Sequence, residues 1–192
     1  MSKIFFTADT HFGHANVIAH DRRPFATVSE MDAELIRRWN SKVGKGDLVY
    51  VLGDMIWKTG DAQSLIRSLN GQIILIRGNH DSLLQNADAK SALAAVKDYD
   101  EIRVNLADGT RRKVVLSHYY IPFYNGHRDR AIHLYGHSHN SEESIHEERI
   151  KGMLAQNGYA TCSYNVGCMH WNYEPVTLDE ILARPAPLEP TE

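Results

Sequence analysis

The sequence has few cysteines, no long apolar run and no large excess of charge of either sign. Its 192 residues include only two cysteines, Cys162 and Cys168, which cannot form the disulfide framework of a small secreted scaffold. We expect both to be reduced thiols in the core of a cytoplasmic protein. No apolar run reaches the ~20 residues of a membrane span. The apolar segment near the N-terminus, Ile4–Phe6, is too short for a signal peptide.

The net charge is small and negative, at −3 from 21 basic and 24 acidic residues. A protein that mainly neutralises a nucleic-acid backbone carries a broad basic surface. Nucleic acid is therefore a disfavoured partner, although a local positive site would still allow it. Hydrophobic content of 43% and charged content of 23% are ordinary for a folded domain. We expect one domain over residues 1–184 and an extended, proline-containing tail over residues 185–192.

Histidine is the residue type that stands out, with eleven in the chain. Several follow apolar runs that are typical of buried strands, beginning with Ile73–Ile76. That run leads into Gly78-Asn79-His80-Asp81, in which the glycine permits a sharp turn. Asn79 offers a carbonyl oxygen and His80 an imidazole that titrates near neutral pH. Ligands of open α/β sheets bind beyond the carboxyl ends of strands, so this segment predicts a functional site.

The first predicted strand, Lys3–Ala8, leads into Asp9-Thr10-His11. Residues two apart in an extended segment point to the same side, which would aim the Asp9 carboxylate and the His11 imidazole at one target. Divalent metals are bound by such a pair. The alternative is a turn capped by Asp9, and an isolated Asp-x-His motif is too common to decide between them.

Two further predicted strands end in the same way. Leu48–Leu52 leads into Gly53-Asp54, where the glycine allows close backbone approach and the Asp54 carboxylate can bridge two metal ions. Val114–Leu116 leads into Ser117 and His118. The alternative for Asp54 is an aspartate in a surface turn. This alternative is less favoured because Asp54 directly follows a predicted buried strand.

A last predicted strand, Ala131–Tyr135, is followed by Gly136-His137-Ser138-His139. Two histidines two residues apart after a buried strand indicate metal binding, because a core has no reason to hold two unpaired imidazoles together. Five such strand ends in one chain are hard to explain as satisfied core groups. We therefore expect them to converge on one site.

The segments between these strands predict helices and one hairpin. Thr27-x-x-Glu30 matches a capping box, and the sequence around Asp108-Gly109 is typical of a hairpin turn. Ser141–Gln156 begins right after His139, so it is either a lid beside the site or a surface helix. One expected helix is capped by Thr27 and ends near Val43. The other expected helices are 60–69, 82–97, 141–156 and a short one after 177, and the remaining expected strands are 101–106, 111–117, 160–166 and 169–176.

The order and content of the five blocks resemble those of the calcineurin-like metallophosphoesterase superfamily, in particular its compact bacterial and phage members. The resemblance runs from about Ile4 to Val176. It implies an α/β fold in which two mixed β-sheets pack face to face with helices on the outside. The blocks are Asp9-Thr10-His11, Gly53-Asp54, Gly78-Asn79-His80-Asp81, His118 and Gly136-His137-Ser138-His139.

The resemblance also implies a pair of divalent metal ions. Asp9, His11 and His139 would hold one ion, Asn79, His118 and His137 the other, and Asp54 would bridge both. His80 matches the family's catalytic histidine, which assists the attack of a metal-bridging hydroxide on phosphorus. Mixed nitrogen and oxygen ligands suit Mn, Fe, Zn, Co or Ni, and we expect Mn.

Three other residues are candidates for contacts around the site. His14 lies close enough in sequence to reach the site, where it could support a metal ligand or contact a substrate. Asp81 can orient His80 or cap the following helix, and we favour the cap. Arg128 can contact a substrate phosphate, although an exposed surface position is the default for it and for Arg23.

We therefore expect a metal-dependent phosphoric ester hydrolase, in particular a phosphodiesterase, that acts on a small phosphate ester. A phosphomonoesterase or a nuclease with the same site is the alternative. A non-catalytic scaffold with the same fold is a further alternative, but such proteins have usually lost ligands or the catalytic histidine. No such position is missing here.

Overall fold

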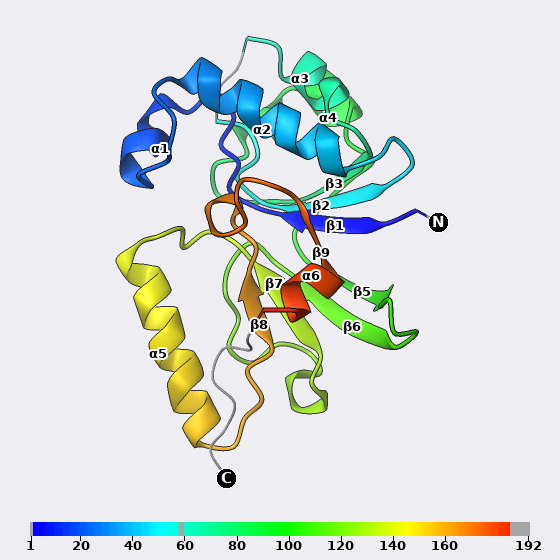
Figure 1. The fold of residues 1–192 in the computed structure, drawn as a ribbon, viewed down its shortest axis with the longest axis vertical. Coiled ribbons are helices and arrows are strands. Elements are labelled where there is room, and N and C mark those ends of the chain that lie inside the picture. The colour runs from blue at the N-terminus through cyan, green and yellow to red at the C-terminus, as the bar shows by residue number, and fades with distance from the viewer. Residues whose placement is uncertain (1, 58–59, 185–192) are drawn as a thin grey trace.

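The computed structural model describes residues 2–57 and 60–184 and shows two mixed β-sheets lying face to face (Figure 1). The first sheet has the strand order β4-β3-β2-β1-β9, and the second has the order β5-β6-β7-β8. The strands of the first sheet are β1 Ile4–Thr7, β2 Leu48–Leu52, β3 Gln72–Ile76, β4 Ala95–Lys97 and β9 Val176–Thr177. Those of the second are β5 Asp100–Asn105, β6 Arg111–Leu116, β7 Ile132–Tyr135 and β8 Ser163–Asn165.

Helices cover the outside of both sheets, as the family resemblance implied. In Figure 1 α2, α3 and α4 lie over the outer side of the first sheet, and α5 lies beside β7 and β8 of the second. The helices are α1 Ala15–His20, α2 Val28–Lys42, α3 Ala62–Ser68, α4 Ala87–Ser91, α5 Glu142–Gln156 and α6 Leu178–Leu182. Short 3-10 helices are η1 Ser82–Gln85, η2 His127–Asp129 and η3 Cys168–His170. None of the described helices is both long and apolar enough to span a bilayer.

Alternation along β1 divides the core into two layers. Phe5 packs with Met31 and Trp39 of α2, between the first sheet and its helices. Phe6 packs with Leu116 and Leu134, between the two sheets. Successive side chains of a strand point to opposite faces, so a strand buried on both faces carries apolar residues without interruption.

The register of the strands brings their carboxyl ends to one place. Thr7 of β1 lies beside Val51 of β2, and Val51 lies beside Leu75 of β3, with all three strands parallel. In the second sheet Leu116 of β6 lies beside Leu134 of the parallel strand β7. The loops that follow these strands therefore meet at the same end of the sandwich, which is where the predicted site residues occur.

Two predictions of local structure were wrong. The helix expected over residues 82–97 ends early, and Ala95–Lys97 forms strand β4 because its backbone pairs with the edge of β3. The strand expected over 169–176 is mostly a turn: the Trp171 and Tyr173 N–H groups both donate to Cys168 O, and only Val176 and Thr177 pair, antiparallel to β1. Tertiary pairing decided both segments. The predicted tail, residues 185–192, lies outside the described residues.

Candidate metal centre

Three predicted ligands form a buried cluster at the end of β1. His139 Nε2 lies 3.2 Å from His11 Nε2 and 3.6 Å from Asp9 Oδ1. All three residues are buried, and their donor atoms lie within 4.8 Å of one another. The loops after β1 and β7 thus place one carboxylate and two imidazoles around a common point.

A second group forms beside the first, at the ends of β3, β6 and β7. Asn79 Oδ1 lies 2.9 Å from His118 Nε2 and 3.1 Å from His137 Nδ1. His118 is buried, whereas Asn79 is exposed. This group is therefore the one more open to solvent.

Asp54 lies between the two groups. Its Oδ2 is 3.7 Å from His11 Nε2 in the first group and 3.7 Å from His118 Nε2 in the second. The other oxygen, Oδ1, accepts a hydrogen bond of 2.8 Å from the backbone N–H of His80. This bond orients the carboxylate so that Oδ2 faces both groups at once.

The backbone at the site is left-handed rather than extended, which corrects the geometry expected for Asp9 and His11. The N–H groups of Asp9 and His11 donate to Gly53 O and Asp54 O at 3.0 Å, so the first loop is bound to the second. Non-glycine residues adopt this conformation at a cost of about 1–2 kcal/mol each, and such strain clusters at functional sites. The left-handed residues of the site are Asp9, His11, Asp54, His137 and His139, with φ of 55, 51, 53, 70 and 48°.

Glycines in two of the loops leave room for the site. A Cβ at Gly53, where φ is +90°, would lie 2.1 Å from His118 Nδ1. A Cβ at Gly78 would lie 2.3 Å from Asp54 Oδ1. Both distances are shorter than van der Waals contact, so the side chains of the site occupy the space that larger residues would fill.

The donor atoms of the second group fit a cation. His118 Nδ1 lies 2.8 Å from Leu52 O and donates to it, which selects the tautomer in which Nε2 carries a lone pair that a metal can bind. That lone pair faces the Asn79 and Asp54 oxygens described above. Acceptor atoms that face one another repel unless a cation lies between them, and imidazole with carboxylate is a set that divalent transition metals bind.

The protonation of the first group points the same way. Burial raises the pKa of Asp9 to about 6, and burial together with the nearby His139 lowers the pKa of His11 to about 2. Burial disfavours a charged His139, but its hydrogen bond to Asp21 and the charge of Asp9 outweigh this and raise its pKa. The raised pKa values of Asp9 and His139 favour added positive charge beside them, and the lowered pKa of His11 leaves a ring nitrogen unprotonated and able to bind a cation.

Asp21 and Arg23, which the sequence analysis did not assign to the site, form a buried ion pair behind it. Asp21 accepts a hydrogen bond from His139 Nδ1 at 2.8 Å, and Arg23 Nη2 lies 2.9 Å from Asp21 Oδ2. Arg23 also donates to the carbonyl oxygens of Asp9 and Thr10 at 2.8 and 2.9 Å. The expectation that Arg23 is a surface residue was wrong, because the loop folds inward onto these carbonyls.

The cap expected from Asp81 is also absent. Its carboxylate makes no capping bond to η1 and instead accepts hydrogen bonds from the N–H groups of Asp54, Met55 and Gly78, at 3.0, 2.9 and 2.7 Å. Asp81 thereby joins the loops after β2 and β3. It braces the backbone that carries Asp54.

The remaining predicted residues lie at different distances from the centre. The His14 ring lies 5.3 Å from the His11 ring and stacks on Trp57, so His14 belongs to the wall of the site. The His80 ring is 6.0 Å from that of His11, and no described residue hydrogen-bonds to its imidazole. Arg128 lies in the exposed helix η2, over the ring of Tyr159 at 6.0 Å.

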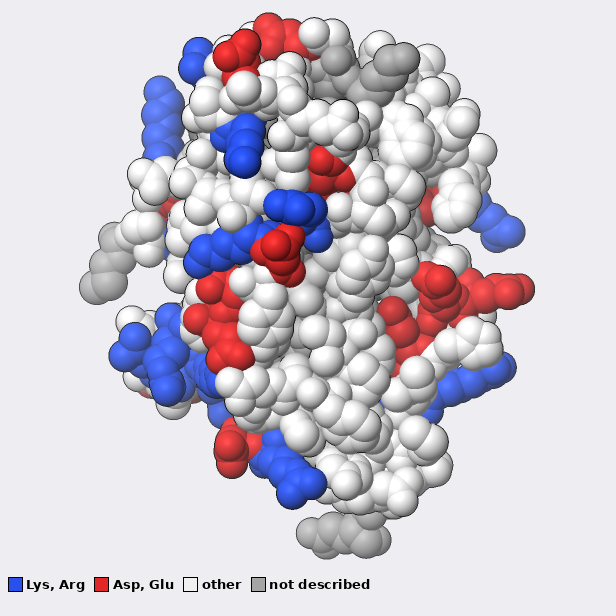
Figure 2. Space-filling view, turned by 180° about the vertical axis from the view of Figure 1, so that it is seen from behind, with Lys and Arg blue, Asp and Glu red and all other residues white. Residues whose placement is uncertain are grey.

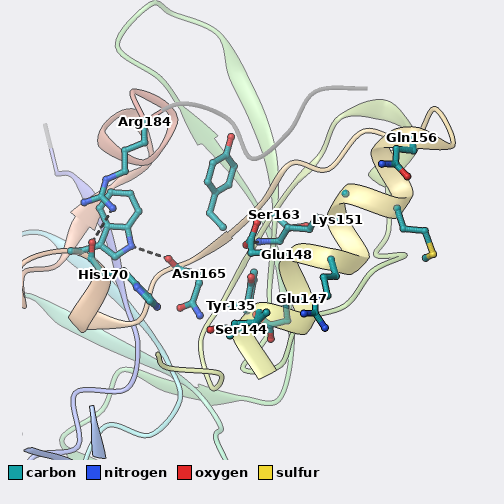
Figure 3. A pocket seen from close by; sticks show the side chains of 16 residues that line it. Tyr135, Ser144, Glu147, Glu148, Lys151, Gln156, Ser163, Asn165, His170 and Arg184 are labelled. Atoms are coloured by element: carbon teal, nitrogen blue, oxygen red, sulfur yellow. Dashed lines mark hydrogen bonds and ion pairs between the residues drawn. The ribbon is translucent and has the colours of Figure 1, made fainter. Parts of the chain in front are cut away.

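Ser138 links the His137–His139 loop to α5. Its hydroxyl donates to Glu147 at 2.8 Å and accepts from Asn165 Nδ2 at 3.0 Å. Glu147 and Asn165 also line a separate cavity of about 840 Å³ between α5 and β8 (Figure 3). None of the seven predicted ligands lines that cavity, whereas His20, His137 and His139 line a smaller one with the first turn of α5. The first turn of α5 thus lies beside the site, whereas the remainder lines the separate cavity and reaches β7 through Lys151, whose Nζ lies 5.2 Å from the centroid of the Tyr135 ring.

Comparison with known families gives one match that covers most of the chain. The family model of the calcineurin-like phosphoesterase superfamily domain matches residues 2–172. All seven predicted ligands and His80 lie within these residues.

Relatives of the chain include phage and archaeal proteins. The gene 66 proteins of mycobacteriophages L5 and D29 are 32% and 34% identical, over 78% and 73% of this chain and 85% and 80% of their own lengths. An uncharacterized protein of Methanocaldococcus jannaschii is 50% identical over 42% of this chain, and the match spans 48% of that protein. A crystal structure of an Aquifex aeolicus protein of unknown function matches with a TM-score of 0.67 and 20% identity, over 95% of this chain and 99% of that one, and so has the same fold.

Proposed function

The chain belongs to the calcineurin-like phosphoesterase superfamily, and we propose that it is a dinuclear metal-dependent phosphodiesterase. The observation that carries this proposal is the position of Asp54, whose Oδ2 is 3.7 Å from an imidazole nitrogen of each donor group. A carboxylate shared between two groups of ligands suits a pair of ions held close together. The family description supports phosphoester hydrolysis, and the preference for diesters is our inference.

Seven residues would hold the two ions. Asp9, His11 and His139 would bind one, and Asn79, His118 and His137 the other, with Asp54 as the shared ligand. We propose Mn²⁺, with Fe, Zn, Co or Ni as alternatives, because mixed nitrogen and oxygen donors suit these ions better than Mg²⁺ or Ca²⁺. When bound, the ions would lower the pKa of a water molecule and offset the negative charge of the phosphate.

The charge of the site suits a phosphate anion. Only two carboxylates, Asp9 and Asp54, are among the seven ligands, so a pair of divalent ions would leave the centre positive. Both carboxylates are buried, where charge interactions are screened less than at the surface. The side chains of the site would therefore bind and orient an anionic ester.

We propose that His80 acts on the substrate rather than on the ions. Its backbone N–H holds Asp54, while its exposed imidazole faces the cavity that His11, Asp54 and Asn79 also line. In this position the imidazole can hydrogen-bond the phosphate as charge develops, or give a proton to the leaving oxygen. A general acid of this kind contributes about 10²–10⁴-fold to the rate.

A small ester is favoured over a nucleic acid. The chain carries a net charge of −3, and on the face seen in Figure 2 the Lys and Arg side chains alternate with Asp and Glu instead of forming a band. Tight binding of a nucleic-acid backbone depends on many cationic contacts. A nuclease would be indicated by salt-sensitive binding of labelled DNA or RNA.

Hydrolysis of bis-p-nitrophenyl phosphate tests the proposal. We expect activity that requires Mn²⁺, and a fall in kcat of about 10²–10⁴-fold in His80→Ala without loss of bound Mn. Asp54→Ala is expected to lose both activity and Mn. His146→Ala, on the exposed side of α5, is the control and should match the wild type. Activity that survives chelation, or a fully active His80→Ala variant, would contradict the proposal, and a higher kcat/KM for p-nitrophenyl phosphate would identify a monoesterase.

A further inference from the structure

Three cavities at the metal centre share lining residues. The central one, about 210 Å³, is lined by residues of both donor groups. It shares Trp57, Asn79 and His80 with a neighbouring cavity of about 360 Å³. It shares His20, His137 and His139 with another of about 330 Å³. The two outer cavities have no lining residue in common, so each opens from a different part of the centre.

This arrangement suits a phosphate with two ester substituents. A phosphate group at the centre can place one substituent in each outer cavity, whereas a monoester would leave at least one of them to solvent. Each outer cavity lies near the lower end of the range of volumes that bind small ligands, roughly 300–1,000 Å³. We call the cavity with Trp57 and Arg77 the aromatic cavity, and the one with Glu142 and Glu143 the acidic cavity.

Trp57 lines the aromatic cavity with an exposed indole ring. The other tryptophans, Trp39 and Trp171, are 2% and 7% exposed, whereas Trp57 is 39% exposed. Its indole stacks on the His14 imidazole at 4.0 Å between ring centroids and 6° between planes, and its ring lies 4.7 Å from that of His80. One part of the indole is therefore held by the protein while the rest borders the cavities of the site.

Backbone hydrogen bonds fix the main chain at Trp57, and the stack on His14 orients the indole before any substrate binds. The Trp57 N–H donates to Phe12 O at 3.0 Å, and the adjacent Ile56 forms a bridge with Phe12. A fixed aromatic surface gains stacking energy with little loss of side-chain entropy. Such a surface binds planar rings of any composition.

The charges of the two outer cavities differ. The Arg77 guanidinium pairs with Asp98 at 3.3 Å, but both side chains are more than half exposed, and exposed pairs of this kind are weak. Arg77 can therefore also face an anionic group, since Asp81, the acidic residue that lines the same cavity, already accepts three backbone N–H groups. The Glu143 carboxylate lies 3.4 Å from His137 Nε2 and, with Glu142, disfavours an anion in the acidic cavity. An anionic substituent would thus be directed to the aromatic cavity.

We propose that the substrate is a phosphodiester with a planar aromatic substituent, which stacks on Trp57 in the aromatic cavity. This inference rests on the proposed function, since it requires the phosphate to lie at the metal centre. Trp57 is then a specificity-determining residue, and Arg77 selects for negative charge on the same substituent.

Binding of two phosphonates to the Mn-loaded protein tests the role of Trp57. Phenylphosphonate and methylphosphonate present the same phosphoryl oxygens and cannot be hydrolysed as esters, so calorimetry measures the effect of the ring alone. We expect phenylphosphonate to bind about tenfold more tightly than methylphosphonate, in line with the energy of ring stacking. Trp57→Ala should bring the two affinities close together, and Trp57→Phe should keep most of the difference.

The control is Phe123→Ala, because Phe123 is an exposed aromatic residue whose ring contacts are with His127 and Tyr159. It should behave as the wild type. Unchanged methylphosphonate affinity in Trp57→Ala shows that the metal centre is intact. An equal preference for phenylphosphonate in wild type and Trp57→Ala would overturn the inference while leaving the proposed function standing. If the wild type neither hydrolysed bis-p-nitrophenyl phosphate nor bound either phosphonate, the proposed function would fail and this inference with it.

A second ligand tests Arg77. We expect 4-carboxyphenylphosphonate to bind several-fold more weakly to Arg77→Gln than to the wild type, with phenylphosphonate affinity unchanged. Equal losses for both ligands would show that Arg77 acts on the phosphoryl group, and no loss for either would remove Arg77 from the proposal.

Discussion

Asp21 accepts a hydrogen bond of 2.8 Å from Nδ1 of His139, and both residues are buried. The bond assigns the proton to Nδ1 and turns Nε2 toward Asp9 and His11. Carboxylates behind metal-binding histidines fix the tautomer and the ring orientation in this way. The ion pair with Arg23 holds Asp21 in turn, so a segment before α2 positions a residue that follows β7.

Replacing Asp21 with Asn should therefore weaken metal binding. We expect the Kd for Mn²⁺ to rise about 10–100-fold, measured by calorimetry at pH 7.5. Asp129→Asn, on the exposed helix η2, is the control. Because Asp21→Asn also leaves Arg23 buried without its partner, stability should fall. Asp21→Asn combined with Arg23→Gln removes the unpaired charge but also the bonds to the Asp9 and Thr10 carbonyls, so it should recover stability only in part and affinity not at all. A Kd for Asp21→Asn within twofold of the wild type would contradict this role.

Gly53→Ala should disrupt the second donor group. The new Cβ would lie 2.1 Å from His118 Nδ1, and φ at this position is +90°. The left-handed backbone alone costs about 1–2 kcal/mol, and His118 must also move away from Leu52 O. We expect lower stability in urea unfolding and a loss of Mn stoichiometry. Gly46→Ala is the matched control, since no atom lies within 4 Å of its added Cβ. Equal Mn content in both variants would show that His118 needs no such space.

Two substitutions of Asp81 should show whether its carboxylate braces the loops after β2 and β3 or caps η1. The first is Asp81→Asn. An amide offers one acceptor where the carboxylate serves three N–H groups, so we expect a loss of about 1–3 kcal/mol in the free energy of unfolding. Mn affinity should fall as well, because Asp54 lies on the braced backbone. Asp81→Ser retains a good helix cap but is too short to reach these groups. Full recovery in Asp81→Ser would mean that the side chain acts as a cap after all.

His133 should make stability depend on pH. Its ring is fully buried, with Nε2 2.8 Å from Ser117 Oγ, and burial lowers its pKa to about 3. Between pH 6.5 and 3 the unfolded state therefore binds more protons than the folded state, so stability falls as pH falls, by about 1.4 kcal/mol per pH unit from this group. The folded protein holds the imidazole neutral throughout this window.

The measurement compares urea unfolding at pH 7.5 and 5.0 in metal-free buffer. We expect His133→Gln to lose about 2 kcal/mol less than the wild type over this change. His146→Gln, at an exposed position of α5, should retain the wild-type dependence. An unaltered dependence in His133→Gln would assign the effect to other groups.

The seven predicted ligands were all marked in the sequence by one local feature. Each block follows an apolar run, and parallel strands place their carboxyl ends side by side, so Asp9, Asp54, His118 and His137 converge even though the backbone at Asp9 is left-handed and not extended. Asp9 and His11 therefore lie around one point, as expected, but for a different reason from the one given. The shared edge of the sheets, not the alternation of side chains, brings them together.

Other residues of the site have no sequence feature that predicts their position there. The segment with Asp21 and Arg23 is polar and contains proline, which is typical of an exposed loop, and only the carbonyls of Asp9 and Thr10 explain why it folds inward. Trp57 follows Ile56 with no feature that distinguishes it from a core residue. Asp81 stands next to His80 in the sequence, but its carboxylate accepts hydrogen bonds from the N–H groups of Asp54 and Met55, which lie in another loop.

The sequence by itself determined the family, the alternation of strands and helices, and the residues that end each strand, because apolar runs, glycines and histidines are local features that need no partner to be recognised. Only the tertiary structure decided which atoms face one another: Asp54 between the two donor groups, Asp21 behind His139, and Trp57 beside His80. Those relationships join residues from separate loops, and their distances depend on how the sheets and loops pack rather than on any single segment of the chain.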